Sequence, residues 1–234
     1  MTQKRISSSI SRAALISIVL LYMMPAMVFA QKKPIAKTPT EKADTIALFR
    51  NIAVSADVVG LAQLAFSDYG QYEAAMRLNL RDKYFPVVEI GYGKANAEDV
   101  ATKLSYKTAA PYGRIGLDFN IAKNKHDDYR IYGGFRYALT YYKFDILGHD
   151  LTDPVWGDKV DFEAHDVKAN YHWIEGVFGV DAKIAGPLRL GWSFRYRRHL
   201  FGNNGTMGNT WYVPGYGKQG GTRMGGTFNV TFEL

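Results

Sequence analysis

Apolar and polar residues alternate along positions 173–197, in two runs separated by a glycine and a proline. Large apolar side chains such as Trp192 take the even positions, and most odd positions carry glycine, serine or charge. A period of two residues is the mark of a strand with two unlike faces. Pairing Ile184 with Leu188 leaves a three-residue loop, Ala185-Gly186-Pro187, which is a typical hairpin length. The stretch therefore predicts a β-hairpin with one apolar face and one polar or charged face.

The same alternation recurs along the rest of the chain and predicts eight strands. With the two hairpin strands, 173–184 and 188–197, the others are 53–66, 73–80, 85–93, 112–121, 129–144 and 223–234. The connections at 81–84, 122–128 and 185–187 are short, whereas those at 94–111, 148–170 and 199–222 are long, and only 67–72 breaks this order. An even strand number with loops sorted this way is typical of outer-membrane barrels. We expect an all-β fold, an eight-stranded antiparallel up-and-down transmembrane β-barrel with short periplasmic turns and longer extracellular loops.

Alternation alone does not say which face looks inward, because a soluble barrel would turn its apolar face to the interior. Turning the charged face of 188–197 outward would expose Arg189, Arg195 and Arg197 together. Each arginine facing lipid near the midplane costs roughly 2–4 kcal/mol, so we expect the apolar face to meet lipid. An eight-stranded interior is just filled by side chains, and buried charges of mixed sign must pair. The expected lumen charge network comprises Asp57, Glu73, Arg77, Glu89, Arg114, Asp118, Arg130, Arg136, Glu175, Asp181, Lys183, Arg189, Arg195 and Arg223.

The first 30 residues read as a cleaved secretory signal. Lys4, Arg5 and Arg12 precede an apolar run to Phe29, and Val28-Phe29-Ala30 places small residues where a signal peptidase reads them. The alternative, an uncleaved inner-membrane anchor, is disfavoured because proline interrupts a run that is already short for a spanning helix. We expect a periplasmic lead-in over 31–51, the barrel over 52–234, and export to the outer membrane.

Composition narrows the chemistry further. The chain of 234 residues has no cysteine, which excludes disulfides, thiolate metal sites, a cysteine nucleophile and an acylated cysteine. Its formal charge of +7 falls to +4 without the first 30 residues, which hold three basic residues and no acid. The remaining basic residues are dispersed along alternating strands, so we expect no nucleic-acid partner.

Four stretches carry a resemblance to a known family: Phe85–Gly93, Ala110-Pro111-Tyr112, Asp153–Gly157 and Tyr212–Lys218. Residues 48–234 resemble small eight-stranded outer-membrane barrels, and these stretches are similar to an uncharacterised family of such barrels from Bacteroidota. The resemblance implies a fold and a location, with no established activity. We expect outer-membrane lipid and lipopolysaccharide as surroundings, insertion by the barrel assembly machinery, and a monomer. Many outer-membrane barrels end in an aromatic residue, whereas this chain ends in Leu234.

The most polar loop, 148–170, contains clustered carboxylates that could hold Ca²⁺ or Mg²⁺. No calcium-loop spacing is present, and Val160, Phe162 and Ala164 alternate with polar residues, which favours a strand or hairpin that continues above the membrane. We therefore expect no metal and no cofactor. The pairs His149-Asp150 and His165-Asp166 could supply a base and its orienting acid, but no nucleophile motif frames the serines of other loops, Ser67 and Ser105.

Aromatic residues interleaved with glycine and proline mark the last long loop. They could form a sugar- or protein-binding platform, or the loop could fold over the barrel mouth. The candidate loop-binding residues are Trp211, Tyr212 and Tyr216 of this loop, together with Asp153 and Trp156 of the loop 148–170. The expected function is a structural or interaction role at the cell surface, with a closed lumen. A lipid A-modifying enzyme and a narrow solute channel are the alternatives.

Overall fold

A computed structural model describes residues 47–99, 102–152 and 157–234. The expected signal segment 1–30, and positions 31–46 of the expected lead-in, lie outside the described residues. The elements are β1 (Phe49–Asp57), α2 (Val58–Phe66), β2 (Tyr69–Leu80), β3 (Tyr84–Asp99), β4 (Leu104–Asn120), β5 (Tyr129–Thr152), β6 (Lys159–Ala185), β7 (Leu188–Asn203), β8 (Tyr212–Val213), β9 (Gly217–Lys218) and β10 (Thr222–Glu233). Among these described residues, no helix is long and apolar enough to cross a membrane.

Eight of the strands pair in a ring, in the order β1-β10-β7-β6-β5-β4-β3-β2, and every pairing is antiparallel. Strand β1 pairs with both β2 and β10, so the order returns to its start. The two-residue strands β8 and β9 form a separate small hairpin. The expectation of an all-β fold with eight antiparallel strands, each next to its sequence neighbour, is confirmed.

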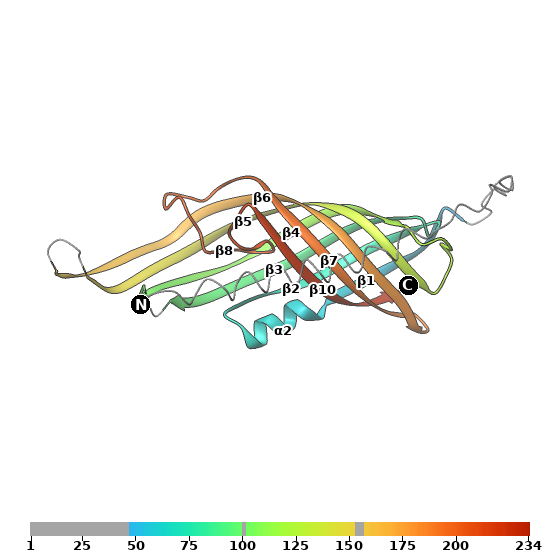
Figure 1. Cartoon of the computed structure of the whole chain (residues 1–234), viewed down its shortest axis with the longest axis horizontal. Coiled ribbons are helices and arrows are strands. Elements are labelled where there is room, and N and C mark those ends of the chain that lie inside the picture. Colours follow the sequence, from blue (N-terminus) through green and yellow to red (C-terminus); the bar gives the residue numbers. More distant parts are fainter. Residues whose placement is uncertain (1–46, 100–101, 153–156) are drawn as a thin grey trace, which may run out of the picture. The chain divides into compact units, whose positions relative to one another are not determined.

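The two ends of the ring differ (Figure 1). The turn end carries the connections 81–83, 121–128 and 186–187, and Leu234 there exchanges backbone hydrogen bonds with Ile52. The mouth end carries α2 and the loop 204–221. Strands β5 and β6 extend furthest beyond their neighbours, away from the turn end (Figure 1). The short connections expected at 81–84, 122–128 and 185–187 therefore lie together at the turn end.

The strand expected over 53–66 is wrong in its second half, because β1 stops at Asp57 and α2 begins at the next residue. The carboxylate of Asp57 accepts hydrogen bonds from the backbone N–H groups of Val59 and Gly60, both at 3.1 Å. This is helix N-capping by an aspartate. The following residues are almost uniformly apolar, so their apparent alternation carried little information about the period.

The long loops expected at 94–111 and 148–170 are also wrong, because most of these positions belong to strands. Asp99 pairs with Leu104, and Thr152 pairs with Lys159. Part of this outcome was expected, since alternation in 160–165 predicted a strand or hairpin there. The turn of the hairpin predicted over 173–197 is one residue shorter than expected. Ala185 pairs with Leu188, after a register shift between Lys183 and Ala185.

The ring is polar inside and apolar outside. On β7 the side chains of Arg189, Ser193 and Arg195 are buried in the interior. The alternate residue Trp192 is 60% exposed on the outer face. The charged face of the expected hairpin is thus the inner one, as the register argument predicted.

The interior holds two kinds of layer. Ion pairs fill the part nearer the turn end, and an aromatic cluster that includes Tyr106, Tyr142, Tyr171 and Trp173 fills the part nearer the mouth end. Glycines make room where these side chains press on the wall: a Cβ on Gly91 would collide with the ring of Tyr112. The inner space is therefore filled by side chains, as expected for eight strands.

Candidate functional site: a charged lumen and the pockets at its mouth

Three glutamates from three strands meet two arginines at the centre of the lumen. Arg195 Nη1 lies 2.7 Å from Glu89 Oε2, and Arg195 Nη2 lies 3.1 Å from Glu73 Oε1. Arg114 lies 2.9 Å from Glu175 through its Nε and also pairs with Glu73 and Glu89. Every one of these side chains is almost completely buried. Each carboxylate therefore serves more than one guanidinium, which compensates charges that would be costly to bury alone.

A second group of ion pairs continues the network toward the turn end. Arg136 binds Asp118 with two parallel hydrogen bonds of 2.7 and 2.9 Å, a bidentate geometry that only arginine can offer. Arg77 lies 3.1 Å from the same Asp118 and 3.4 Å from Asp181, and Asp181 in turn accepts from Arg189 at 2.7 Å. The network thus crosses the lumen and joins strands far apart in the sequence.

The structure places most of the expected network residues together. Ion pairs join Glu73, Arg77, Glu89, Arg114, Asp118, Arg130, Arg136, Glu175, Asp181, Arg189 and Arg195. Three others lie apart from it. Asp57 caps α2, Lys183 is exposed near the turn end, and Arg223 lies at the mouth end.

A polar cluster at the turn end was not expected from the sequence. Asp82, in the 81–83 turn, accepts hydrogen bonds from Asn79 Nδ2 (2.7 Å) and from Arg50, and lies 2.8 Å from His126 Nδ1. Burial raises the pKa of Asp82, but hydrogen bonds from His126, Asn79 and Arg50 lower it more, so that the pKa lies below its ordinary value of 3.8. Asn120 Nδ2 also donates to the Asp82 carbonyl at 2.9 Å. A recognisable signal was the Asn79-x-x-Asp82 spacing, because asparagine and aspartate bond locally to turn backbone.

The loop 204–221 folds into the mouth and forms a plug, residues 212–218. Arg114 Nη2 donates to the carbonyl of Gly215 (2.8 Å), and Arg197 Nη1 donates to the carbonyl of Tyr216 (2.9 Å). Tyr212 and Tyr216 are buried, and burial raises the pKa of Tyr212 to about 12, so its phenol stays protonated. Both tyrosines, which the sequence suggested as loop-binding residues, therefore face inward. Asp153 and Trp156 lie outside the described residues.

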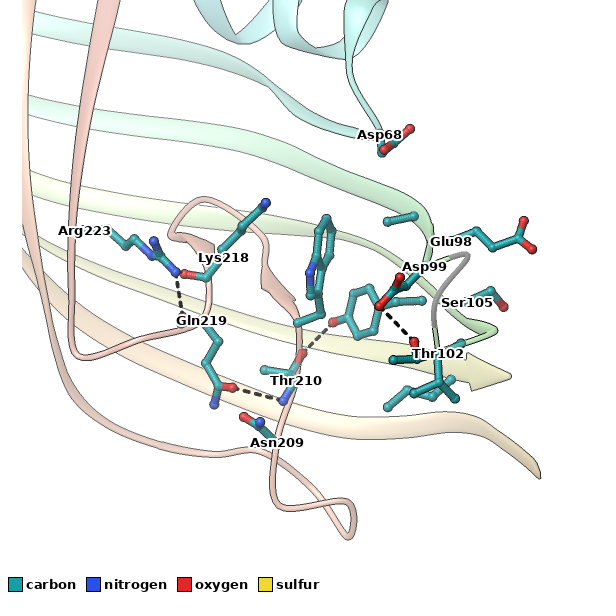
Figure 2. A pocket seen from close by; sticks show the side chains of 15 residues that line it. Asp68, Glu98, Asp99, Thr102, Ser105, Asn209, Thr210, Lys218, Gln219 and Arg223 are labelled. Atoms are coloured by element: carbon teal, nitrogen blue, oxygen red, sulfur yellow. Dashed lines mark hydrogen bonds between the residues drawn. The ribbon is translucent and has the colours of Figure 1, made fainter. Parts of the chain in front are cut away.

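Trp211 lines a pocket beside the plug, here called the mouth pocket, with a volume of about 780 Å³ (Figure 2). Tyr106 and Thr210 lie in it with their hydroxyl oxygens 2.5 Å apart. Lys218 and Arg223 stand on one side, and the carboxylates of Asp68, Glu98 and Asp99 stand on the other. The pocket thus combines an aromatic wall with separated charges of both signs.

The residues considered for acid–base chemistry lie apart from one another. His165 lies 3.5 Å from Glu163 and 3.9 Å from Asp145 on an exposed part of β6 and β5. Ser105 lines the mouth pocket, where its hydroxyl donates to the carbonyl of Leu147 (3.5 Å). The side chains of His149 and Asp150 lie outside the described ones. In the part of the chain that the structure describes, no group of three or more His, Cys, Asp or Glu residues is placed to hold a metal ion.

The ring and its contents define the class of this molecule: an all-β protein of eight antiparallel strands around a charged interior. The family described as "Domain of unknown function (DUF6048)" matches residues 11–234, and the chain belongs to that family. No curated protein and no solved structure matches the chain.

Proposed function

We propose that this protein is a closed eight-stranded barrel of the outer membrane, with an occluded lumen and a structural or interaction role at the cell surface. The observation that carries the proposal is the inverted polarity of the ring. Ile90 is 65% exposed and Ile115 is 61% exposed on the outer face, whereas Arg136 is 2% exposed inside. A protein in water buries the first kind of residue and exposes the second.

The extent of the outer apolar face supports a lipid environment. Soluble monomers rarely expose contiguous apolar patches larger than a few hundred Å². Here exposed large apolar side chains occur on β1, on α2 and on every long strand of the ring, including Phe135 on β5, Phe178 on β6 and Phe232 on β10. Lipid satisfies such a surface, and pairing around the ring satisfies most backbone groups of its strands.

Exposed aromatic residues lie near both ends of this apolar face. Tyr84 and Tyr129 lie at the starts of β3 and β5, near the turn end, and Tyr72, Tyr92 and Tyr141 lie nearer the mouth end. Girdles of this kind occur where membrane barrels cross the two interfaces. With the expected signal at 1–30, the turn end would face the periplasm and the mouth end the exterior. Insertion by the barrel assembly machinery, membership of a Bacteroidota barrel family and a monomeric state are parts of the same proposal.

The filled lumen favours an interaction role over a channel. The ion pairs of Glu89, Arg136 and Asp118 cross the interior, and the plug covers the mouth end. Ions that pass would have to break these pairs, which is costly at low dielectric. We therefore expect no discrete conductance from the purified protein in planar bilayers.

The test of location uses the full chain expressed with its own N-terminus. The protein should appear in the outer-membrane fraction and should migrate differently on a detergent gel before and after boiling. Protein that remains dissolved in the periplasmic fraction without detergent would overturn the proposal. Mass spectra of lipid A from cells with and without the protein should be identical, whereas a changed acylation pattern would favour the lipid-modifying enzyme.

A further inference from the structure

The wall of the ring is incomplete on the mouth side of β1. Five residues of β1 pair with β10, from Ala53–Glu233 to Asp57–Asn229, and β1 then ends. Residues 222–228 of β10 and 69–73 of β2 continue past this point, with no strand between them among the described residues. The helix α2 packs against both β2 and β10 and so covers the gap.

Asp57 organises this break in the wall. Its carboxylate accepts from the N–H groups of Val59 and Gly60, which starts the helix, and from the N–H of Phe228 at 3.2 Å, where pairing with β10 stops. Gly60 is buried against β2, since a Cβ there would collide with the carbonyl of Gln71. The helix therefore lies closely on the wall, and the Asp57 carboxylate is occupied by three backbone donors.

The exposed side of α2 is apolar. The nine residues of the helix carry no charge, and Phe66 at its end is 90% exposed, with Val58 and Leu61 also exposed. Gln63 is the single polar side chain of this nine-residue helix, so the helix has no continuous polar face to show to water. If the ring spans a membrane, α2 lies against the surrounding lipid.

A small polar cavity lies beneath α2, here called the side pocket, with a volume of about 190 Å³. Three cationic side chains, Arg197, Lys218 and Arg223, line it, and Asp57 is the one acidic residue among its lining residues. Unlike the arginines of the lumen, Lys218 and Arg223 form no ion pair with a described carboxylate: Arg223 donates to the carbonyls of Lys218 and Gln219, at 2.6 and 2.8 Å. Cations therefore outnumber carboxylates among the residues that line the side pocket, and two of them, Lys218 and Arg223, also line the mouth pocket.

The edge of β10 that β1 leaves unpaired, residues 222–228, also favours a polar occupant. Strand residues that leave their hydrogen bonds unmade at membrane depth are tolerated only where they are covered by protein or line a polar cavity. Gly225 and Gly226 of this edge line the side pocket, where small residues leave the backbone accessible. An occupant with several acceptor oxygens would match both the backbone N–H groups and the cations.

An apolar groove, here called the outer groove, lies along the other side of α2. It has a volume of about 670 Å³ and is lined by Leu61 of the helix with outer-face residues that include Tyr72, Ile90 and Tyr92. One helix thus separates a cationic pocket from an apolar groove. This combination matches an amphipathic molecule with an anionic head and a hydrocarbon chain.

We infer that the gap covered by α2 is a binding site for a phosphorylated lipid of the surrounding leaflet. Its phosphate lies in the side pocket, bound by Lys218 and Arg223, and an acyl chain lies in the outer groove against Leu61. Arginine and lysine are the common partners of phosphate, because charge-assisted hydrogen bonds to its oxygens are strong. The inference rests on the proposed function, since the lipid must reach α2 from a membrane.

The test uses the purified full chain in detergent micelles and measures lipid binding by native mass spectrometry. The probe is dioleoyl phosphatidate, and dioleoylglycerol is the matched lipid without phosphate. The wild-type protein should bind phosphatidate saturably and the glycerol lipid at least tenfold more weakly. The double variant Lys218→Gln/Arg223→Gln should lose at least tenfold in affinity for phosphatidate. The control, Lys107→Gln/Lys168→Gln, removes the same charge from exposed strand positions and should bind like the wild type.

The inference is overturned by equal binding of the two lipids, by unchanged binding in the double variant, or by equal losses in the double variant and its control. Competition by inorganic phosphate at the affinity of the lipid would show a free-anion site and would also overturn it. For each variant, gel migration of boiled and unboiled protein is compared and its membrane fraction is measured. These two measurements separate the lipid site from the proposed membrane location. A folded, membrane-inserted protein that binds no phosphatidate contradicts only the lipid site, whereas a protein absent from the membrane contradicts both.

Discussion

Arg195 on β7 and Glu89 on β3 meet at the centre of the ring, 106 positions apart in the sequence, with Nη1–Oε2 and Nη2–Oε1 distances of 2.7 and 3.3 Å. The same carboxylate accepts from Arg114 at 3.1 Å and from Arg136 Nε at 3.0 Å. One glutamate thus neutralises parts of three guanidinium groups in a space that is closed to water. The stability of the whole ring should depend on it.

Glu89→Leu should destabilise the folded ring by about 3–5 kcal/mol, because removing one partner leaves buried charge uncompensated. Urea unfolding in detergent, followed by the gel migration of unboiled protein, measures the change. Glu98→Leu, on the same strand at the mouth pocket, is the control and should change stability little. The pair Glu89→Leu/Arg195→Leu should recover part of the loss. Equal stability of Glu89→Leu and Glu98→Leu would contradict the role of the network.

The outer face gives a second prediction. Ile115 lies about half-way along the apolar part of β4, with Val88 and Tyr137 as its cross-strand neighbours. Ile115→Arg should reduce membrane insertion and cost roughly 2–4 kcal/mol, the penalty for arginine facing lipid near the midplane. The yield of heat-modifiable protein in the outer-membrane fraction measures the effect.

Phe162 provides the matched control for Ile115. It lies on the outer part of β6, where it pairs with Gly148 between the polar neighbours Asp161 and Glu163. Phe162→Arg should insert like the wild type, because this part of the hairpin would project beyond the membrane. Comparable losses from both substitutions would contradict the position of the membrane on the ring.

The ring of strands could be predicted from the sequence because the alternation that specifies each strand lies within that strand. In Leu188–Arg197 the side chains that face outward are all large and apolar, and those that face inward are all charged or small. A slip of one residue would exchange the faces, so the pattern specifies the register as well as the strand. The inner ion pairs then follow from the closed geometry, and Glu73, Glu89 and Arg114 meet as the alternation implied.

The mouth end could be predicted less well because contacts across the ring decide it. The helix α2 depends on Asp57, whose carboxylate caps the first turn and also accepts a hydrogen bond from β10. Residues 58–66 alone do not predict these contacts. The plug depends on Arg114 and Arg197, which donate to its carbonyls from other strands. A carbonyl is the same at every residue, so such contacts leave no trace in the sequence.

The plug gives a third prediction. Gly215 has a positive φ of +81°, and a Cβ there would also collide with the ring of Tyr112. Left-handed backbone costs an L-residue roughly 1–2 kcal/mol, so Gly215→Ala should displace the plug from the mouth. Trypsin should then cut after Lys218 in the folded protein at least several-fold faster than in the wild type. Gly221→Ala, with open space around its Cβ position, should leave the rate unchanged.

The turn-end cluster gives a prediction about pH. Burial raises the pKa of Asp82, but hydrogen bonds from His126, Asn79 and Arg50 bring it below its ordinary value of 3.8. A carboxyl group whose pKa is lower in the folded state stabilises that state above its unfolded pKa, and this stabilisation is lost as the pH falls through the folded pKa. The stability difference between wild type and Asp82→Asn should therefore be present at about pH 5 and should shrink as the pH falls below about 4. Urea unfolding across this range measures it.

Two variants, Asp82→Asn and His126→Gln, make the pH test specific for the Asp82 carboxylate. Asp82 has a positive φ of 55°, a conformation that asparagine tolerates, so the substitution changes charge with little backbone strain. His126→Gln removes the hydrogen bond from His126 Nδ1 that now lowers the Asp82 pKa. With that donor weakened, the folded pKa should rise toward its ordinary value and the acid-dependent loss should begin at a higher pH. A difference that stays constant down to about pH 2.5, or an onset that does not move in His126→Gln, would show that Asp82 does not couple folding to protonation.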